Sequence, residues 1–98
     1  MDIQLTCRHC ELSEKVRDYA TKKMERVLKH FDGVHSVEMT LSAEGVATKV
    51  ELILGTVRST RLVATASEAE PLAAIDVVMD KMDRQIKKVK DKLRERHA

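Results

Sequence analysis

The chain has 98 residues, enough for one domain with a single core but not for two. Charged residues make up 35% of it, and Tyr19 and Phe31 are its only aromatic residues, which argues against a protein that stacks single-stranded bases on aromatic side chains. No stretch is long and apolar enough to span a membrane, and Met1–Cys10 lacks the apolar core of a signal peptide, so the sequence predicts a cytoplasmic protein with reduced cysteines.

The charges are unevenly distributed along the chain. Residues 13–31 and 81–96 hold 14 of the 18 lysines and arginines but only 6 of the 16 acidic residues. These two stretches are therefore strongly positive and the rest of the chain is negative. Such a polarised protein attracts a polyanion to one of its sides.

The first half of the chain alternates between strand and helix patterns. Ile3–Arg8 has the period of two that is typical of a half-buried strand. Ser13 is a suitable N-cap for a helix that ends near Asp32-Gly33. The apolar face of that helix is expected to consist of Val16, Ala20, Met24, Val27 and Phe31.

Three further strands and a long helix are expected after that helix. Gly45 marks a turn between the first two of these strands, and Gly55 marks the start of a looser connection to the third. Pro71 fits the first turn of the second helix. The inward rows are expected to be Val37, Met39, Leu41 and Ala43, then Val50, Leu52 and Leu54, then Leu62, Ala64 and Ala66.

The resulting order is β-α-β-β-β-α. It predicts an α+β fold, a two-layer sandwich with both helices on one face of a four-stranded sheet and the other face in water. Residues 1–98 are expected to form one domain.

At about 100° per residue, the basic residues of each helix fall into stripes. If the helices are neighbours, these stripes make one continuous basic surface that contacts phosphates without reading sequence. The alternative is that each basic stripe is an ordinary solvated face. Because two helices both carry such a stripe, this is the weaker interpretation. The stripes are Lys15, Lys22, Arg26 and Lys29 on the first helix, and Lys81, Arg84, Lys88 and Lys92 on the second, with Lys87, Lys90 and Arg94 on its other margin.

Cys7-Arg8-His9-Cys10 contains a C-x-x-C spacing. A structural zinc ion needs four ligands, and this segment offers three at best. A thioredoxin-like site needs the motif at a helix N-terminus, whereas Ser13 begins the helix three residues later. Two ordinary cysteines, with Cys7 buried on the inner face of its strand, are the favoured interpretation.

An apolar ladder follows Pro71 along the second helix. It could form a coiled-coil seam for a partner helix, which would make the protein an interaction module, but core packing is the favoured interpretation. No glycine-rich phosphate loop, nucleophile motif or helical histidine pair suggests an enzyme, a cofactor or a metal. The ladder consists of Leu72, Ile75, Met79, Met82, Ile86, Val89 and Leu93.

Several strings resemble the hibernation promoting factors and ribosome-associated inhibitors of bacteria. Thr6-Cys7-Arg8-His9 followed by Glu11-Leu12-Ser13-Glu14 is similar to the opening of that family, and Lys29-His30-Phe31-Asp32 to the end of its first helix. Pro71-Leu72-Ala73-Ala74-Ile75-Asp76 resembles P-Y-A-A-I-D, and Asp80-Lys81-Met82-Asp83-Arg84-Gln85-Ile86-Lys87-Lys88 resembles D-K-L-x-R-Q-[IL]-x-K.

The resemblance implies a dsRBD-like fold that binds the small ribosomal subunit between head and body. There it would overlap the mRNA and the A-site and P-site tRNA path, and keep ribosomes idle during stress or stationary phase. The family's rRNA-contacting residues correspond to Lys22, Lys23, Arg26 and Lys29 in the first helix and to Arg84, Lys87, Lys88, Lys90 and Lys92 in the second.

Two positions depart from the family pattern: Cys7 stands where glycine is common, and Leu72 replaces a tyrosine. Ending at Ala98, the chain resembles the short form, which acts with a separate ribosome modulation factor. A truncated long form would look identical.

Overall fold

In the computed structural model, residues 2–57 and 60–97 are described, with side chains described for residues 3–57 and 60–91. The order β-α-β-β-β-α is as predicted. Within the described residues, neither helix has an apolar stretch long enough to cross a membrane. The elements are β1 (Asp2–Arg8), α1 (Glu14–His30), β2 (Val34–Glu44), β3 (Ala47–Thr56), β4 (Arg61–Glu68) and α2 (Pro71–His97).

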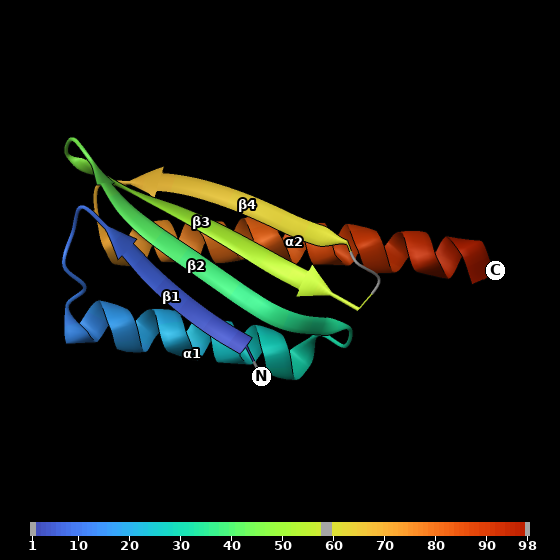
Figure 1. Cartoon of the computed structure of the whole chain (residues 1–98). Coiled ribbons are helices and arrows are strands. Elements are labelled where there is room, and N and C mark those ends of the chain that lie inside the picture. The colour runs from blue at the N-terminus through green and yellow to red at the C-terminus, as the bar shows by residue number, and fades with distance from the viewer. Residues whose placement is uncertain (1, 58–59, 98) are drawn as a thin grey trace.

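The four strands form one sheet in the order β1-β2-β3-β4 (Figure 1). The β2–β3 and β3–β4 pairs are antiparallel, as the short connections predict. β1 and β2 are parallel, because α1 lies between them in the chain and returns it to the same end of the sheet. The strands therefore form an antiparallel meander with one parallel edge strand.

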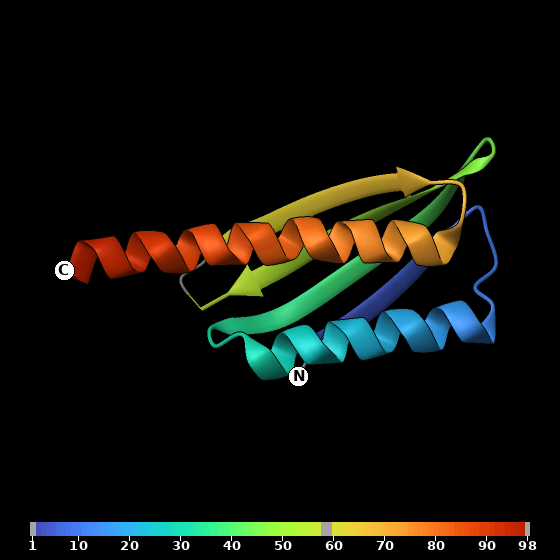
Figure 2. The ribbon, with the colours of Figure 1, turned by 180° about the vertical axis from the view of Figure 1, so that it is seen from behind.

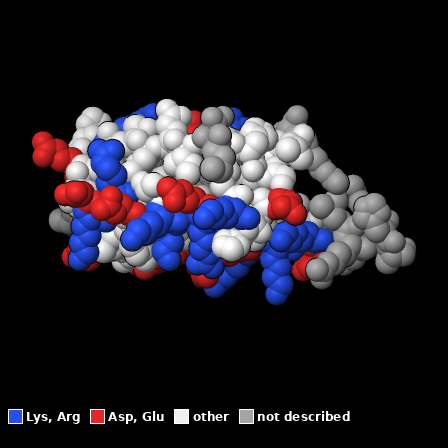
Figure 3. All heavy atoms as spheres, turned by 90° about the horizontal axis from the view of Figure 1, so that it is seen from below, with Lys and Arg blue, Asp and Glu red and all other residues white. Residues whose placement is uncertain are grey.

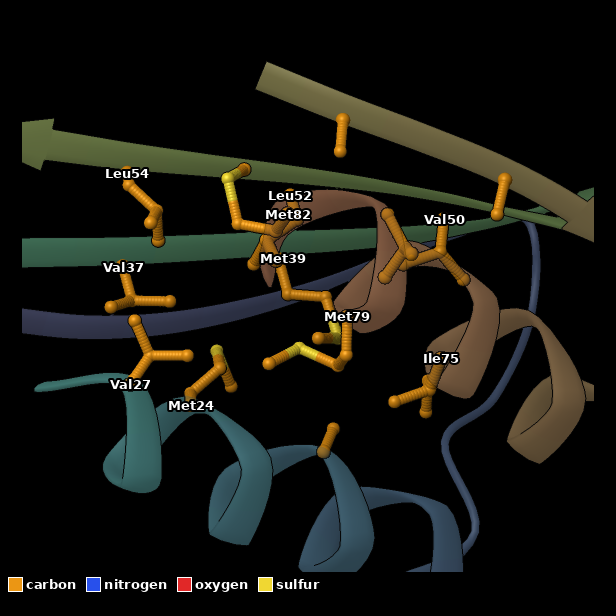
Figure 4. Packing of buried hydrophobic residues seen from close by; sticks show 14 of the residues in the cluster. Met24, Val27, Val37, Met39, Val50, Leu52, Leu54, Ile75, Met79 and Met82 are labelled. Carbon is orange, nitrogen blue, oxygen red and sulfur yellow. The ribbon is translucent and has the colours of Figure 1, made fainter. Parts of the chain in front are cut away.

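Both helices cover the same face of the sheet, and the other face is open (Figures 1 and 2). α2 packs on β3 and β4, and α1 packs on β1 and β2. The core lies between these two layers (Figure 4). With almost no aromatic residues available, flexible methionines fill much of this space, among them Met24, Met39, Met79 and Met82.

The inward rows of the strands are largely as predicted. Residues on the predicted inner side of β2, β3 and β4 are buried, with two differences: Leu62 is half-buried against the core, and Ala43 is exposed near the end of β2. The apolar ladder of α2 packs in the core from Ile75 to Ile86, so over that range it offers no seam to a partner helix. Val89 is 40% exposed, and Leu93 lies outside the described side chains.

The prediction that Gly55 begins a connection is wrong, because β3 continues through Gly55 to Thr56. Gly55 pairs with Ser36 on one side and Arg61 on the other. A Cβ atom at this position would clash with the Ser36 hydroxyl oxygen and would lie 3.2 Å from the imidazole of His35. Close approach of neighbouring side chains, not a turn, therefore requires glycine here.

Gly55→Ala is expected to destabilise the fold by about 1–3 kcal/mol, because the added methyl group must displace Ser36. The double variant Gly55→Ala/Ser36→Gly removes the obstructing side chain and should recover part of that loss. Urea unfolding of these two variants and of Ser36→Gly alone measures the coupling. Equal destabilisation of both would show that the contact with Ser36 does not explain the glycine.

The prediction of two reduced, ordinary cysteines also needs correction. Cys7 and Cys10 form a disulfide. Cys7 is half-buried rather than buried, and Cys10 packs against the edge of the core. The C-x-x-C spacing alone does not show that the chain turns back directly after β1 and brings the two sulfurs together.

Candidate nucleic-acid interface

The outer side of α1 carries the first group of basic side chains. The helix begins after Ser13, whose hydroxyl oxygen accepts a hydrogen bond from the backbone N–H of Val16 at 3.2 Å. Because its apolar face is held against the sheet, the residues on the opposite side must point into water. Lys22, Arg26 and Lys29 are accordingly exposed, and Lys23 is half-buried.

The basic residues of α2 lie on both of its flanks. Lys90 faces α1, since its Nζ atom lies 4.9 Å from the centre of the Phe31 ring. Lys81 faces away from α1, since its Nζ atom donates a hydrogen bond of 2.9 Å to the backbone carbonyl of Thr65 on β4. By the helical period, Lys87 lies on the flank of Lys90 and Lys88 on that of Lys81.

Three carboxylates separate these basic groups. A groove of about 140 Å³ between the helices is lined by Lys23 and Arg26 from α1, and by Asp76, Asp80 and Asp83 from α2. Figure 3 shows acidic side chains interspersed among the lysines and arginines of the molecule's underside, along α1. The predicted single continuous basic surface is therefore wrong: an acidic seam, Asp76, Asp80 and Asp83, lies between two basic surfaces.

The first basic surface, here called the α1 track, consists of Lys22, Lys23, Arg26 and Lys29. The second, the α2 outer track, consists of Arg84 and Lys88. Arg84 forms an ion pair of 3.1 Å with Asp80, which is largely exposed and of little energetic value. No other ion pair occurs among the described residues, so within that part of the chain the cations of the α1 track have no carboxylate in direct contact.

Side chains of α2 also close the outer edge of the sheet. Besides the bond from Lys81, the amide Nε2 of Gln85 donates a hydrogen bond of 2.7 Å to the carbonyl of Val63. Val63 and Thr65 are two apart on β4, so their carbonyls point out of the same strand edge. Lys81, which belonged to a predicted basic stripe, thus has a structural role.

One hydrogen bond joins the two helices across the groove. The hydroxyl of Tyr19 donates to the carboxylate of Asp76. This bond raises the pKa of the Tyr19 phenol above 10.0, and burial and the negative charge of Asp76 raise it further. Lys23 completes the cluster, with its Nζ atom 5.2 Å from the centre of the Tyr19 ring.

Asp76→Asn should lower the pKa of Tyr19 toward its ordinary value, whereas Asp80→Asn, one turn further along α2, should leave it unchanged. Tyrosinate absorbance measures this cleanly, because the chain has one tyrosine and no tryptophan. Since folding raises this pKa, the wild-type bond stabilises the fold below pH 10 and is lost as the pH rises through the folded pKa. A Tyr19 pKa that is the same in both variants would contradict the link.

The proposed rRNA-binding residues do not form one cluster. Lys22, Lys23, Arg26 and Lys29 share one helix side, Lys87 and Lys90 face the seam, and Arg84 and Lys88 lie beyond it. The side chain of Lys92 lies outside the described part of the chain. The helical period puts Asp76, Asp80 and Asp83 on one flank of α2, but only the packing of the helices shows that this flank faces α1.

Potential metal ligands do not converge in the part of the chain that the structure describes. No three histidine, cysteine, aspartate or glutamate side chains gather there as a candidate metal site.

Residues 3–94 match the profile of the family described as Sigma 54 modulation protein / S30EA ribosomal protein. The chain belongs to this family. Among its relatives, the ribosome hibernation promoting factor of Pseudomonas putida is 37% identical over 92 residues, which are 94% of this chain and 89% of that protein. The ribosome hibernation promoting factor of Escherichia coli strain K12 is 32% identical over 95 residues, 97% of this chain and 99% of that protein.

Solved structures agree with this membership of the S30EA family. The N-terminal domain of Thermus thermophilus protein Y aligns with a TM-score of 0.77 and 28% identity, over 91% of this chain and 99% of that one. A ribosomal subunit interface protein from Coxiella burnetii aligns with a TM-score of 0.84 over 93% of this chain and 99% of that one, at 21% identity, which supports the fold alone. Hibernation factors of this family are non-enzymatic binding proteins, so the chain is not an enzyme.

Proposed function

We propose that this protein is a ribosome hibernation factor of the cytoplasm, and that residues 1–98 act as a single ribosome-binding domain. Its relatives over nearly the whole chain are named ribosome hibernation promoting factors. The observation that carries the proposal at the level of residues is the α1 track. Its cations have no acidic ion-pair partner among the described residues, and Lys22, Arg26 and Lys29 are exposed.

The proposed target is the small ribosomal subunit, in the channel that otherwise holds mRNA and the A-site and P-site tRNAs. Occupying that channel would block translation and keep the ribosome idle under stress. Contacts from lysine and arginine to phosphates suit this role, because they grip folded RNA by its backbone without requiring a base sequence. A separate ribosome modulation factor is a further proposed partner.

The acidic seam bears on how RNA would lie on the helices. Phosphates are repelled by the carboxylates of Asp76, Asp80 and Asp83, which disfavours a single RNA backbone that crosses directly from the α1 track to the α2 outer track. We therefore expect the two tracks to contact two separate segments of rRNA backbone.

Co-sedimentation with purified small ribosomal subunits over a salt series tests the proposal. The logarithm of the affinity should fall with the logarithm of the salt concentration by about 0.7–0.9 for each phosphate contact, and one protein should saturate one subunit. mRNA or tRNA added in excess should compete with the protein. Absence of binding at low salt, or binding that tRNA and mRNA leave unchanged, would contradict the proposed site.

A further inference from the structure

The connection between β1 and α1 contains a chemical group that the proposed RNA contacts do not use. The segment Cys7-Arg8-His9-Cys10 turns at His9, whose φ of 59° lies in the left-handed region. Along an extended strand, residues three apart are separated by about 10 Å. The Cα atoms of Cys7 and Cys10 are only 5.9 Å apart, within the range that a disulfide spans, and their sulfurs are bonded.

Backbone carbonyl oxygens lie near both sulfurs of the bridge. The Sγ atom of Cys7 lies 2.6 Å from the carbonyl oxygen of Cys10, and the Sγ atom of Cys10 lies 3.9 Å from the carbonyl oxygen of Leu41. When the bridge opens, the two sulfurs must separate to nonbonded distance, and these carbonyl oxygens can then accept hydrogen bonds from the thiols.

The surroundings favour a reversible bond over a permanent one. This step rests on the proposed function, since a protein that binds ribosomes works where thiols are kept reduced and where disulfides are usually transient or sensing. The neighbouring Arg8 and His9 are exposed, so a small thiol can approach the half-buried cysteines from that side. The pair is not at a helix N-terminus, since α1 starts after Ser13, so it is not arranged as a disulfide-exchange catalyst.

We propose that Cys7 and Cys10 are a reversible thiol–disulfide pair that fastens the β1–α1 connection when oxidised. A low-molecular-weight disulfide such as oxidised glutathione is the oxidant. One cysteine thiolate attacks it, forms a mixed disulfide and releases one thiol. The second thiolate then displaces the other thiol and closes the bridge, so the protein loses two electrons and two protons and the oxidant becomes two thiols.

The bridge acts on a strand at the edge of the sheet. Among the described strands β1 pairs with β2 alone, and Cys10 packs against the core at the start of the connection. Closing the ring restricts the unfolded chain and holds β1 to the start of α1. Because a four-residue ring is small, oxidation should raise the melting temperature by about 5 °C or more rather than by tens of degrees.

The test is thiol trapping of the full chain in a series of glutathione buffers that spans cytosolic conditions, read by the mass added per protein. The expected result is one transition in which both thiols appear together as the buffer becomes reducing. Cys7→Ser and Cys10→Ser should each instead carry one glutathione in oxidising buffer. The oxidised and reduced wild type should differ in melting temperature, and the double serine variant should not.

Two free thiols in the most oxidising buffer would overturn the proposal, and so would a bridge that survives the most reducing one. Stoichiometric zinc retained by the reduced protein would overturn it as well, because the pair would then be a metal site. The measurements use no ribosomes. Failure of the thiol transition is therefore distinguishable from failure of the proposed binding to the small subunit.

Discussion

Reversing the charges of Lys22 and Lys29 together is expected to weaken binding to small ribosomal subunits by about tenfold or more at moderate salt. Both side chains are exposed and lie on the same side of α1, seven residues apart, directed away from the groove carboxylates. Each is expected to make one phosphate contact. The double variant Lys22→Glu/Lys29→Glu should therefore also reduce the salt slope of the affinity by about 1.4–1.8.

The matched control changes the same amount of charge on the opposite face. Arg8 and Arg61 are exposed and occupy the open side of the sheet, where Arg8 pairs across strands with Ser42 and Arg61 with Gly55. Arg8→Glu/Arg61→Glu should leave the salt slope close to that of the wild type. Equal weakening by both pairs would mean that net charge rather than the α1 track governs binding, and an unchanged slope for Lys22→Glu/Lys29→Glu would exclude phosphate contacts there.

The parts of the fold that depend on local periodicity were predictable from the sequence. The strand and helix order follows from switches between periods of two and of about 3.6, because each element must bury one face. Ser13 and Pro71 mark the starts of the helices for reasons that are local to the backbone. The fold class needed no knowledge of tertiary contacts.

The features that could not be predicted from the sequence depend on contacts between residues and on turns that no local pattern marks. The sequence alone does not distinguish a glycine that forms a turn from one that is required inside a strand by a neighbouring side chain. At Gly55 that neighbouring side chain is Ser36. The bridge between Cys7 and Cys10 depends on the turn at His9, which no apolar pattern marks. Both errors came from reading special conformations from the local pattern alone.

The exposure of the basic side chains on the helices was predictable from the sequence, but their arrangement relative to one another was not. A helical projection gives the angle of each basic side chain, and most of those with described side chains are exposed. It does not tell which flank of α2 faces α1, because that depends on how each helix packs on the sheet. Consequently the projection places Lys81 in a binding stripe although its Nζ atom bonds to the edge of β4, and it does not show that Asp76, Asp80 and Asp83 face α1.

Leu52→Ala is expected to destabilise the protein by about 2–5 kcal/mol, because it removes buried apolar atoms and leaves a cavity that the neighbouring side chains fill only in part. Leu52 is fully buried in β3, where it pairs with Met39 on β2 and Ala64 on β4, beneath the two helices (Figure 4). Since a domain of this size is stable by only about 5–15 kcal/mol in total, the variant should lose a large part of its stability.

The next residue along the same strand provides the control. Ile53 points to the open face and is only half-buried. Ile53→Ala therefore shortens a side chain without creating a cavity in the core, and it should lower the free energy of unfolding by about 1 kcal/mol or less. Urea unfolding at equal protein concentration measures both variants, and similar m-values would show that only stability changed. If Leu52→Ala and Ile53→Ala lost the same stability, both faces of the sheet would have to be buried, which would contradict the described fold. If only Leu52→Ala loses stability, and the folded variant still binds ribosomes, the core serves to hold α1 and α2 in place. Binding itself then depends on the cations of those helices.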